Sequence, residues 1–235
     1  MKDNGWFRRV KVSADGVGLV SRAGCLLLRE VADASGVTRA WTAALLDTYR
    51  ALPTAHLPGA VLRDLAVTIA DGGDALAHLA GLRDQVKLFG PVASDATAWR
   101  VVQRVDAAHL QRLRSARAAA RARVWAAGGG PRLFAGRMLI VDFDATISLA
   151  HSDKQNAAAT WKHTYGFHPL LVYLDRPDIG GGEALAGLLR PGNAGSNTAA
   201  DHVTVLDLAL AALPAQVRPG NTGGIWLLAR SDSAG

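Results

Sequence analysis

The sequence changes character at the run Gly128-Gly129-Gly130-Pro131, and this break constrains the fold more than any other feature. From about residue 23 to residue 127, apolar residues recur at helical spacing, and Gly or Pro separates the segments. After the break the pattern becomes extended, beginning with the apolar run 138–141. We therefore expect an α/β protein with a helical N-terminal region, 1–130, followed by a mixed sheet, 131–235.

The two regions also differ in charge. Residues 1–137 hold 20 Lys and Arg against 11 Asp and Glu, whereas residues 138–235 hold 6 against 9. Arg accounts for 21 of the 26 cations, and its planar guanidinium suits phosphate. A basic front half is expected of a protein that binds nucleic acid, although a GC-rich genome also produces chains rich in Ala and Arg.

Cysteine usage and hydropathy exclude several classes of protein. Cys25 is the single cysteine, which rules out a disulfide framework and paired-cysteine zinc motifs. No apolar run approaches the roughly 18 residues of a membrane span, and the charged N-terminus is not followed by the apolar stretch of a signal peptide. We expect a cytoplasmic, nucleoid-associated protein with no membrane partner.

One candidate for DNA contact is a turn between two short helical patterns. The small residues Ser35-Gly36-Val37 form this turn, and residues 41–46 follow it as the second helix, as in a helix-turn-helix. The alternative is an ordinary pair of packed helices, because a Gly turn between short helices is common.

The second candidate is a predicted helix over residues 106–127 that carries five arginines and one aspartate. Three of the arginines share one stripe and two lie on another side: Arg114, Arg117 and Arg121, then Arg112 and Arg123. The alternative is a solvated helix face. Because so few acids accompany the arginines, the helix favours contact with phosphates over internal ion pairs.

The second region alternates strand patterns with one helix. Residues 160–165 and 167–174 are predicted as strands joined by a tight turn at Gly166, and the Gly- and Pro-rich segment 175–196 as a loop. A capping box at 198–201 begins a helix whose buried stripe would be Val203, Leu206, Leu210 and Leu213. A last strand over 225–229 leads to Asp232.

Two aspartates end the first strand of this region. Asp142 and Asp144 are two residues apart, so they point to the same face, where two carboxylates repel unless a cation lies between them. A strand-helix-strand unit brings the carboxyl ends of its strands to one sheet edge, which adds Asp232. These oxygen ligands would suit Mg²⁺ or Mn²⁺. The alternative is that Asp232 only caps a turn.

Five segments, in order, resemble bacterial insertion-sequence transposases of the DDE type, group 1, the insertion sequence 1380 family. They are ADGGDALAHLAGLRDQVKLFGPVASDATAWRVV (70–102), VDFDAT (141–146), WKHTYGFHPLLVYLD (161–175), LRPGNAGSNTAADH (189–202) and LLARSDSAG (227–235). The resemblance implies a ribonuclease-H-like domain, with three antiparallel strands, a helix and a parallel strand. It also implies double-stranded DNA as partner, at the element ends and the target, and a homodimer. In such enzymes three acidic residues hold two divalent metals for strand cleavage and transfer.

Two of the three acidic residues of the family have counterparts in this sequence. The resemblance assigns the first to Asp144, with Asp142 as its neighbour on the same face, and the second to Asp232. The third, a Glu on a later helix, has no counterpart, because Glu30 and Glu183 both precede Asp232. The resemblance therefore implies an N-terminal part of a transposase, and we expect this chain alone not to catalyse transposition.

Two other functions fit parts of the sequence. The string MLIVDFDAT also matches a haloacid-dehalogenase-type phosphatase, in which Asp142 would be the nucleophile and Asp144 the general acid/base. The Lys that such an enzyme needs late in the chain is missing, since Lys154 and Lys162 come too early. The second alternative is a non-catalytic transposase remnant that binds DNA or dimerises and acts as an inhibitor. Four histidines near the acidic segment lack metal-ligand spacing and are read as structural or DNA-facing: His151, His163, His168 and His202.

Overall fold

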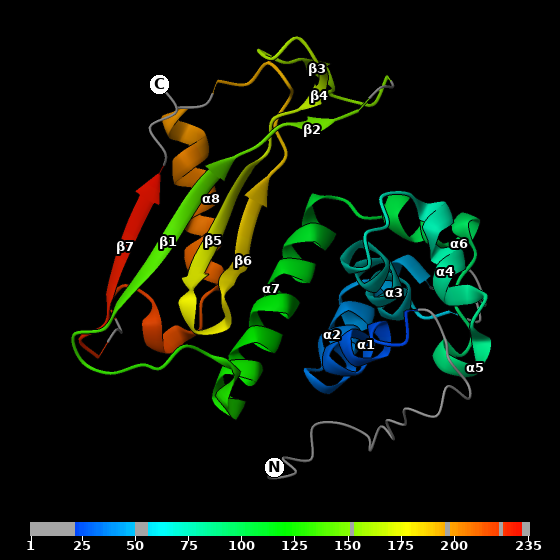
Figure 1. The fold of residues 1–235 in the computed structure, drawn as a ribbon, viewed down its shortest axis with the longest axis horizontal. Coiled ribbons are helices and arrows are strands. Elements are labelled where there is room, and N and C mark those ends of the chain that lie inside the picture. The colour runs from blue at the N-terminus through cyan, green and yellow to red at the C-terminus, as the bar shows by residue number, and fades with distance from the viewer. Residues whose placement is uncertain (1–21, 50–55, 151–152, 196–197, 221–222, 232–235) are drawn as a thin grey trace. The chain divides into compact units, whose positions relative to one another are not determined.

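The computed structural model describes residues 22–49, 56–150, 153–195, 198–220 and 223–231. The chain divides into two compact units, Met1–Arg123 and Val124–Gly235. The division falls at the end of helix α7 (Ala107–Val124), a few residues before the glycine run at which the sequence pattern changes. Each unit has a hydrophobic core of its own. Figure 1 shows the helices of the first unit and the sheet of the second.

The described part of the first unit is helical. It contains α1 (Cys25–Ala34), α2 (Val37–Ala44), α3 (Pro58–Ala70), α4 (Ala80–Arg83), α5 (Val86–Phe89), α6 (Asp95–Gln103) and α7, with 3₁₀ turns η1 (Leu46–Tyr49) and η2 (Leu76–Leu79). Its core gathers residues from most of these elements, among them Leu45, Val61, Leu79, Leu82, Phe89 and Val101. The predicted helical character of this region is therefore confirmed.

Small residues set how closely these helices pack. At Gly59, in the first turn of α3, an added Cβ would lie 2.0 Å from the carbonyl oxygen of Thr38 and 2.4 Å from Thr42 Oγ1. The backbone N–H of Gly59 instead donates to Thr42 Oγ1 at 3.2 Å. Only glycine therefore allows α3 to approach α2 this closely.

The second unit is a four-stranded sheet covered by helix α8 (Ala199–Ala212), with strand order β6-β5-β1-β7. Strand β5 (Leu170–Arg176) pairs antiparallel with β1 (Met138–Ala145) on one side and with β6 (Gly181–Leu188) on the other. Strand β7 (Trp226–Ser231) pairs parallel with β1 at the edge of the sheet. The segment before this sheet contains a π turn, η3 (Trp125–Gly129), and short 3₁₀ turns follow β5 and α8, η4 (Pro177–Ile179) and η5 (Ala215–Val217). The order of antiparallel strands, helix and parallel strand is the one that the family resemblance implies.

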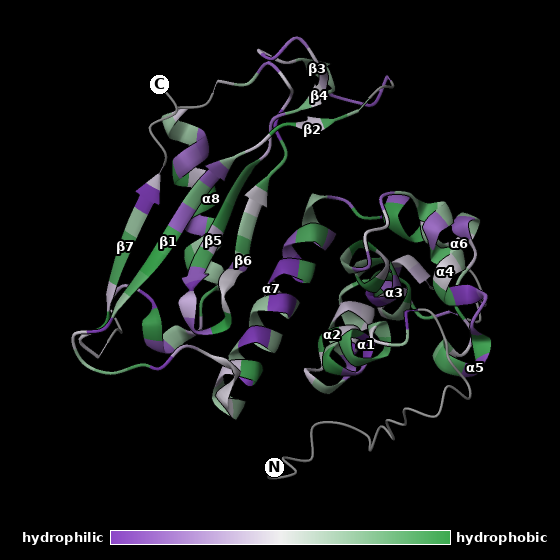
Figure 2. Cartoon of the chain, in the orientation of Figure 1, coloured by the Kyte–Doolittle hydropathy of each residue, from purple (hydrophilic) through white to green (hydrophobic). Residues whose placement is uncertain are grey.

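Alternation along β1 separates its two faces. Leu139, Val141 and Phe143 are buried in the core that α8 completes, so Asp142 and Asp144 lie on the opposite face. Figure 2 shows β1 and β7 apolar at their beginnings and hydrophilic toward their carboxyl ends. Polar groups therefore gather at one end of these parallel strands.

A small second sheet extends from that end. Its strands are β2 (Ser148–Leu149), β3 (Ala158–Ala159) and β4 (Tyr165–Phe167), in the order β2-β4-β3. Gly166, at the centre of β4, has φ +154°, and a Cβ there would lie 2.2 Å from the carbonyl oxygen of Ser148. The central strand can therefore pair on both sides only with glycine at this position.

Three details of the predicted sheet are wrong. Residues 160–164 form a turn between β3 and β4 rather than a strand, and Gly166 lies within β4 rather than between two strands. The segment 175–196 contains β6, because pairing with β5 satisfies the backbone despite the glycines. In α8, Val203 is exposed and Val205 is buried in its place, whereas the other predicted residues of the stripe, Leu206, Leu210 and Leu213, do pack on the core.

Candidate functional site

The candidate site is the carboxyl end of β1, where two aspartates share a face. Asp144 is exposed, and within the described residues its carboxylate has no hydrogen-bond or ion-pair partner. Asp142 is half-buried and lies two residues earlier in the strand, on the same face. The structure thus confirms that β1 is a strand and that these two carboxylates project from one side of it.

Arg230 of β7 holds the carboxylate of Asp142. Its Nε lies 2.5 Å from Asp142 Oδ1, and its Nη2 lies 2.9 Å from Oδ2. The two residues are direct partners in the parallel register of β1 and β7. Both oxygens of Asp142 therefore already accept a charge-assisted hydrogen bond, which leaves them less suited than those of Asp144 to bind a metal or to attack a phosphate.

Asp232 lies outside the described residues. The register of β1 with β7 is described as far as Phe143 opposite Ser231. The next position in the sequence is an aspartate on both sides, Asp144 after Phe143 and Asp232 after Ser231. The role of Asp232 thus stays a prediction.

The described residues alone do not form a metal centre. No group of three or more His, Cys, Asp or Glu among them could hold an ion. What the structure offers is one exposed carboxylate, Asp144, at the end of a strand whose other acid is neutralised. This donor chemistry fits a hard cation that keeps much of its water, such as Mg²⁺ or Mn²⁺, provided that further ligands come from beyond the described residues.

A buried arginine organises the same end of the sheet, and sequence reasoning did not single it out. Arg190 donates from Nε to the carbonyl oxygen of His168 at 3.0 Å and from Nη1 to Gly195 at 2.9 Å and to Asp201 Oδ2 at 3.2 Å. It thereby links the start of β5, the loop after β6 and the first turn of α8. An arginine among Gly and Pro gave no periodic signal that could have marked it as buried.

Of the four histidines near the acidic segment, three lie within the described residues, and whether they are structural or face DNA stays a prediction. His168 is buried and its Nδ1 lies 2.9 Å from the carbonyl oxygen of Ala194. The ring of His202 stacks on Phe143, with 5.7 Å between centroids. His163 is exposed in the turn between β3 and β4, and His151 lies outside the described residues.

The arginines of α7 do not all face solvent. Arg112 donates to the carbonyl oxygen of Ala44 at 2.9 Å and to Asp47 at 2.8 Å, and Arg123 donates to the carbonyl oxygen of Ser35 at 2.8 Å. Arg121 is buried, whereas Arg114 and Arg117 are half-buried. Two of the five thus anchor α7 to α2 and the adjoining turns, and DNA contact by the set stays a prediction.

The helix-turn-helix pattern forms as helices but is packed within its unit. The turn between α1 and α2 is made by Ser35 and Gly36, the latter with φ +78°. Trp41 of α2 donates its indole N–H to the carbonyl oxygen of Leu113 at 3.3 Å. This side of α2 therefore packs on α7.

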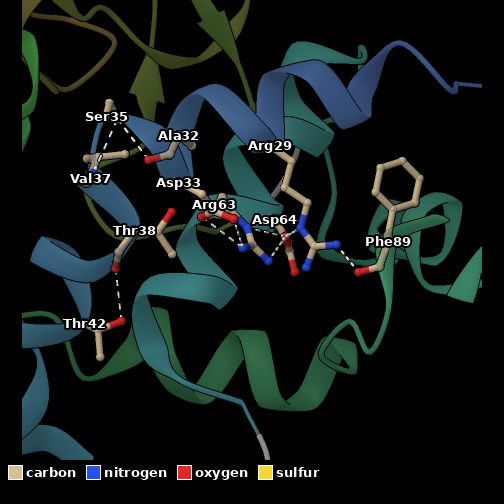
Figure 3. A network of polar contacts seen from close by, with 10 residues as sticks. All are labelled: Arg29, Ala32, Asp33, Ser35, Val37, Thr38, Thr42, Arg63, Asp64 and Phe89. Atoms are coloured by element: carbon tan, nitrogen blue, oxygen red, sulfur yellow. Dashed lines mark hydrogen bonds and ion pairs between the residues drawn. The ribbon is translucent and has the colours of Figure 1, made fainter. Parts of the chain in front are cut away.

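Other charged groups of the first unit form a buried cluster (Figure 3). Asp64 is 2 % exposed and accepts from Arg63 Nε at 2.9 Å, while Arg29 Nε lies 3.1 Å from it. Arg63 also donates to Asp33 at 2.9 Å, and Arg29 donates to the carbonyl oxygen of Phe89. Burial raises the pKa of the Asp64 carboxyl and lowers the pKa of Arg29. These arginines stabilise the helices and are not available to phosphate.

Comparison with known proteins identifies a family. A family model described as transposase DDE domain group 1 matches residues 4–235. No curated protein and no solved structure matches the chain. Within the described residues, no helix has both the length and the apolar character needed to cross a membrane.

Proposed function

We propose, because the chain belongs to the transposase DDE domain group 1 family, that it acts on double-stranded DNA as part of an insertion-sequence transposase. The observation that carries this proposal is the family match over residues 4–235, together with the paired aspartates at the end of β1. The five segments quoted above support the insertion sequence 1380 family within that group.

The sheet topology supports a ribonuclease-H-like domain. Three antiparallel strands, a helix and a strand parallel to the first give the order β6-β5-β1-β7. In this arrangement the carboxyl ends of β1 and β7 meet at one edge. An acidic metal site at that edge would lie outside the core, open to a long polymer such as DNA.

Asp144 and Asp232 are the residues that would hold the metal. A bound Mg²⁺ or Mn²⁺ polarises a phosphodiester and activates water, and two such ions would stabilise the attacking and leaving oxygens. Asp144 is suited to this role because its carboxylate is exposed and unpaired among the described residues. Asp142, whose carboxylate Arg230 already holds, would not be a primary metal ligand.

Neither glutamate matches the third acid of the family pattern. Glu183, in β6, accepts from Arg176 at 2.8 Å and from the indole N–H of Trp125 at 3.2 Å. Glu30 precedes both aspartates in the chain, whereas the third acid of the family follows them. Strand cleavage by the family pattern needs a third carboxylate. We therefore expect this chain, by itself, to bind DNA without cutting it.

The basic helical unit is the part that would bind the DNA backbone. Arg114 is the best placed of the α7 arginines, because it is partly exposed and has no partner among the described residues. Arg117, Arg121, Arg112 and Arg123 would add to the positive potential while supporting the helix. A homodimer stays a prediction, which sedimentation of the purified chain would test.

The test measures DNA binding and strand cleavage by the purified 235-residue chain. Fluorescence anisotropy with a labelled 30-base-pair duplex, at 50 to 300 mM salt, should give an affinity whose logarithm falls linearly with the logarithm of salt concentration. With 5 mM Mn²⁺, sequencing gels should show no cleavage. Arg114→Gln should weaken binding and reduce the slope by about 1.

The matched control is Arg218→Gln, because Arg218 lies after α8 and, among the described residues, donates to the carbonyl oxygens of Leu213 and Ala211. It should bind DNA as the unchanged protein does. An affinity that does not depend on salt, or no binding at 50 mM salt, would contradict the proposal. Metal-dependent release of phosphate from small phosphate esters would select the phosphatase alternative instead.

A further inference from the structure

The turn between β3 and β4 presents a tryptophan to solvent. Trp161, Lys162 and His163 form its tip and are all exposed, and Trp161 has 69 % of its surface accessible. This is the largest exposed fraction of any large apolar side chain among the described residues. Because single exposed apolar side chains are common on protein surfaces, a binding role for Trp161 depends on the turn around it.

The turn is held in one shape before anything binds. The backbone N–H of Thr160 donates to the carbonyl oxygen of Thr164 at 2.8 Å, and the two hydroxyl oxygens lie 2.7 Å apart. The N–H of His163 donates to the carbonyl oxygen of Thr160 at 3.0 Å. Thr160 itself is 6 % exposed. Because the backbone is fixed, binding through Trp161 would lose little conformational entropy.

A cation accompanies the indole. Lys162 Nζ lies 5.0 Å from the centroid of the Trp161 ring, within the range of a cation–π contact. The segment 160–167, TWKHTYGF, contains no acidic residue. The tip therefore combines a flat aromatic face with positive charge, which matches a nucleobase and its neighbouring phosphate.

The turn is attached to the sheet edge that carries Asp144. Strand β2 begins three residues after the end of β1, and β4 leads within a few residues into Leu170, which pairs with Ala145. Figure 1 shows the small sheet extending from the carboxyl end of β1. A DNA strand that lies at Asp144 would thus run close to the small sheet.

We propose that Trp161 stacks on an unpaired nucleobase of the DNA held at this edge, with Lys162 contacting the adjoining phosphate. This inference rests on the proposed function only for its substrate, DNA. An aromatic side chain can stack on any of the bases, so the contact would favour an unpaired base whatever its identity. Trp161 would in this way favour DNA that is opened near the site.

The experiment compares three duplexes of the same sequence: fully paired, with one unpaired thymine, and with an abasic residue in place of that thymine. Anisotropy titrations with the full chain should give about 5- to 150-fold tighter binding of the thymine duplex than of the abasic one. Trp161→Ala should abolish this difference, and Trp161→Phe should keep part of it.

The matched control is Trp226→Ala, because Trp226 is 67 % exposed in the same unit but begins β7, at the opposite end of the sheet. It should keep the full preference. The inference is overturned if the unchanged protein binds the three duplexes equally, or if Trp161→Ala keeps the preference, while salt-dependent binding persists. Absence of all DNA binding would instead overturn the proposed function.

Discussion

Arg230 and Asp142 face each other across strands β7 and β1, and the guanidinium engages both oxygens of the carboxylate. This ion pair distinguishes two aspartates that cannot be told apart by their spacing in the sequence. Asp142 is neutralised by a residue 88 positions later in the chain, and Asp144 is left as the exposed acid. The same contact joins the only parallel pair of strands among the described residues.

Removing this pair should cost little stability. The side chains of Arg230 and Asp142 are 58 % and 29 % exposed, so solvent screens their attraction. A double-mutant cycle with Arg230→Ala and Asp142→Ala should give a coupling energy of about 0.5–1 kcal/mol in urea unfolding. The coupling should shrink in 1 M salt, and a value unchanged by salt would contradict this account.

Asp64 should contribute far more to the free energy of unfolding than the Arg230–Asp142 pair does. Asp64→Ala would leave Arg63 and Arg29 buried without their shared carboxylate, at a cost of about 3–5 kcal/mol. Urea unfolding monitored by circular dichroism measures the loss. The control is Asp95→Ala, whose ion pair with Arg83 is exposed and should be worth at most about 1 kcal/mol. Equal effects of the two substitutions would show that burial of the cluster is not what matters.

The Asp178 carboxyl should make the free energy of unfolding depend on pH in the acidic range. Its hydrogen bonds from Arg176 hold the pKa of Asp178 below the ordinary value of 3.8. A depressed carboxyl adds stability above the pKa of the unfolded chain and loses it as pH falls through the folded pKa. Asp178→Asn should therefore unfold at lower urea than the unchanged protein at pH 7, and the gap should shrink as the pH falls below about 4. A gap that does not shrink in acid would contradict this.

Gly166 should resist replacement. In Gly166→Ala the new Cβ would lie 2.2 Å from the carbonyl oxygen of Ser148 and 2.8 Å from the N–H nitrogen of Ala150, both backbone atoms. We expect a loss of about 1–3 kcal/mol and faster hydrogen exchange in β2 and β4. The control is Gly181→Ala at the start of β6, where a Cβ meets nothing within 4 Å. Slow exchange in β2 and β4 of Gly166→Ala would be the contrary result.

The sequence predicted the strand β1, the helix α8 and the parallel strand β7 because each carries a long local pattern. It missed β6, whose glycines resemble a loop and whose strand structure comes from pairing with β5. The clamp of Arg230 on Asp142 was equally hidden, since it depends on the register between strands far apart in sequence. Likewise, the spacing of Arg112 and Arg123 did not indicate that they donate to carbonyl oxygens of α2 and of the turn before it.

The most direct test of the account is a calorimetric titration of Mn²⁺ into the full chain bound to duplex DNA, for the unchanged protein and for Asp144→Asn and Asp142→Asn. The account predicts that Asp144→Asn abolishes the metal-binding heat, whereas Asp142→Asn, whose carboxylate Arg230 already holds, changes the affinity by less than about tenfold. The contrary result, binding lost with Asp142→Asn and kept with Asp144→Asn, would refute the assignment of Asp144 as the metal ligand.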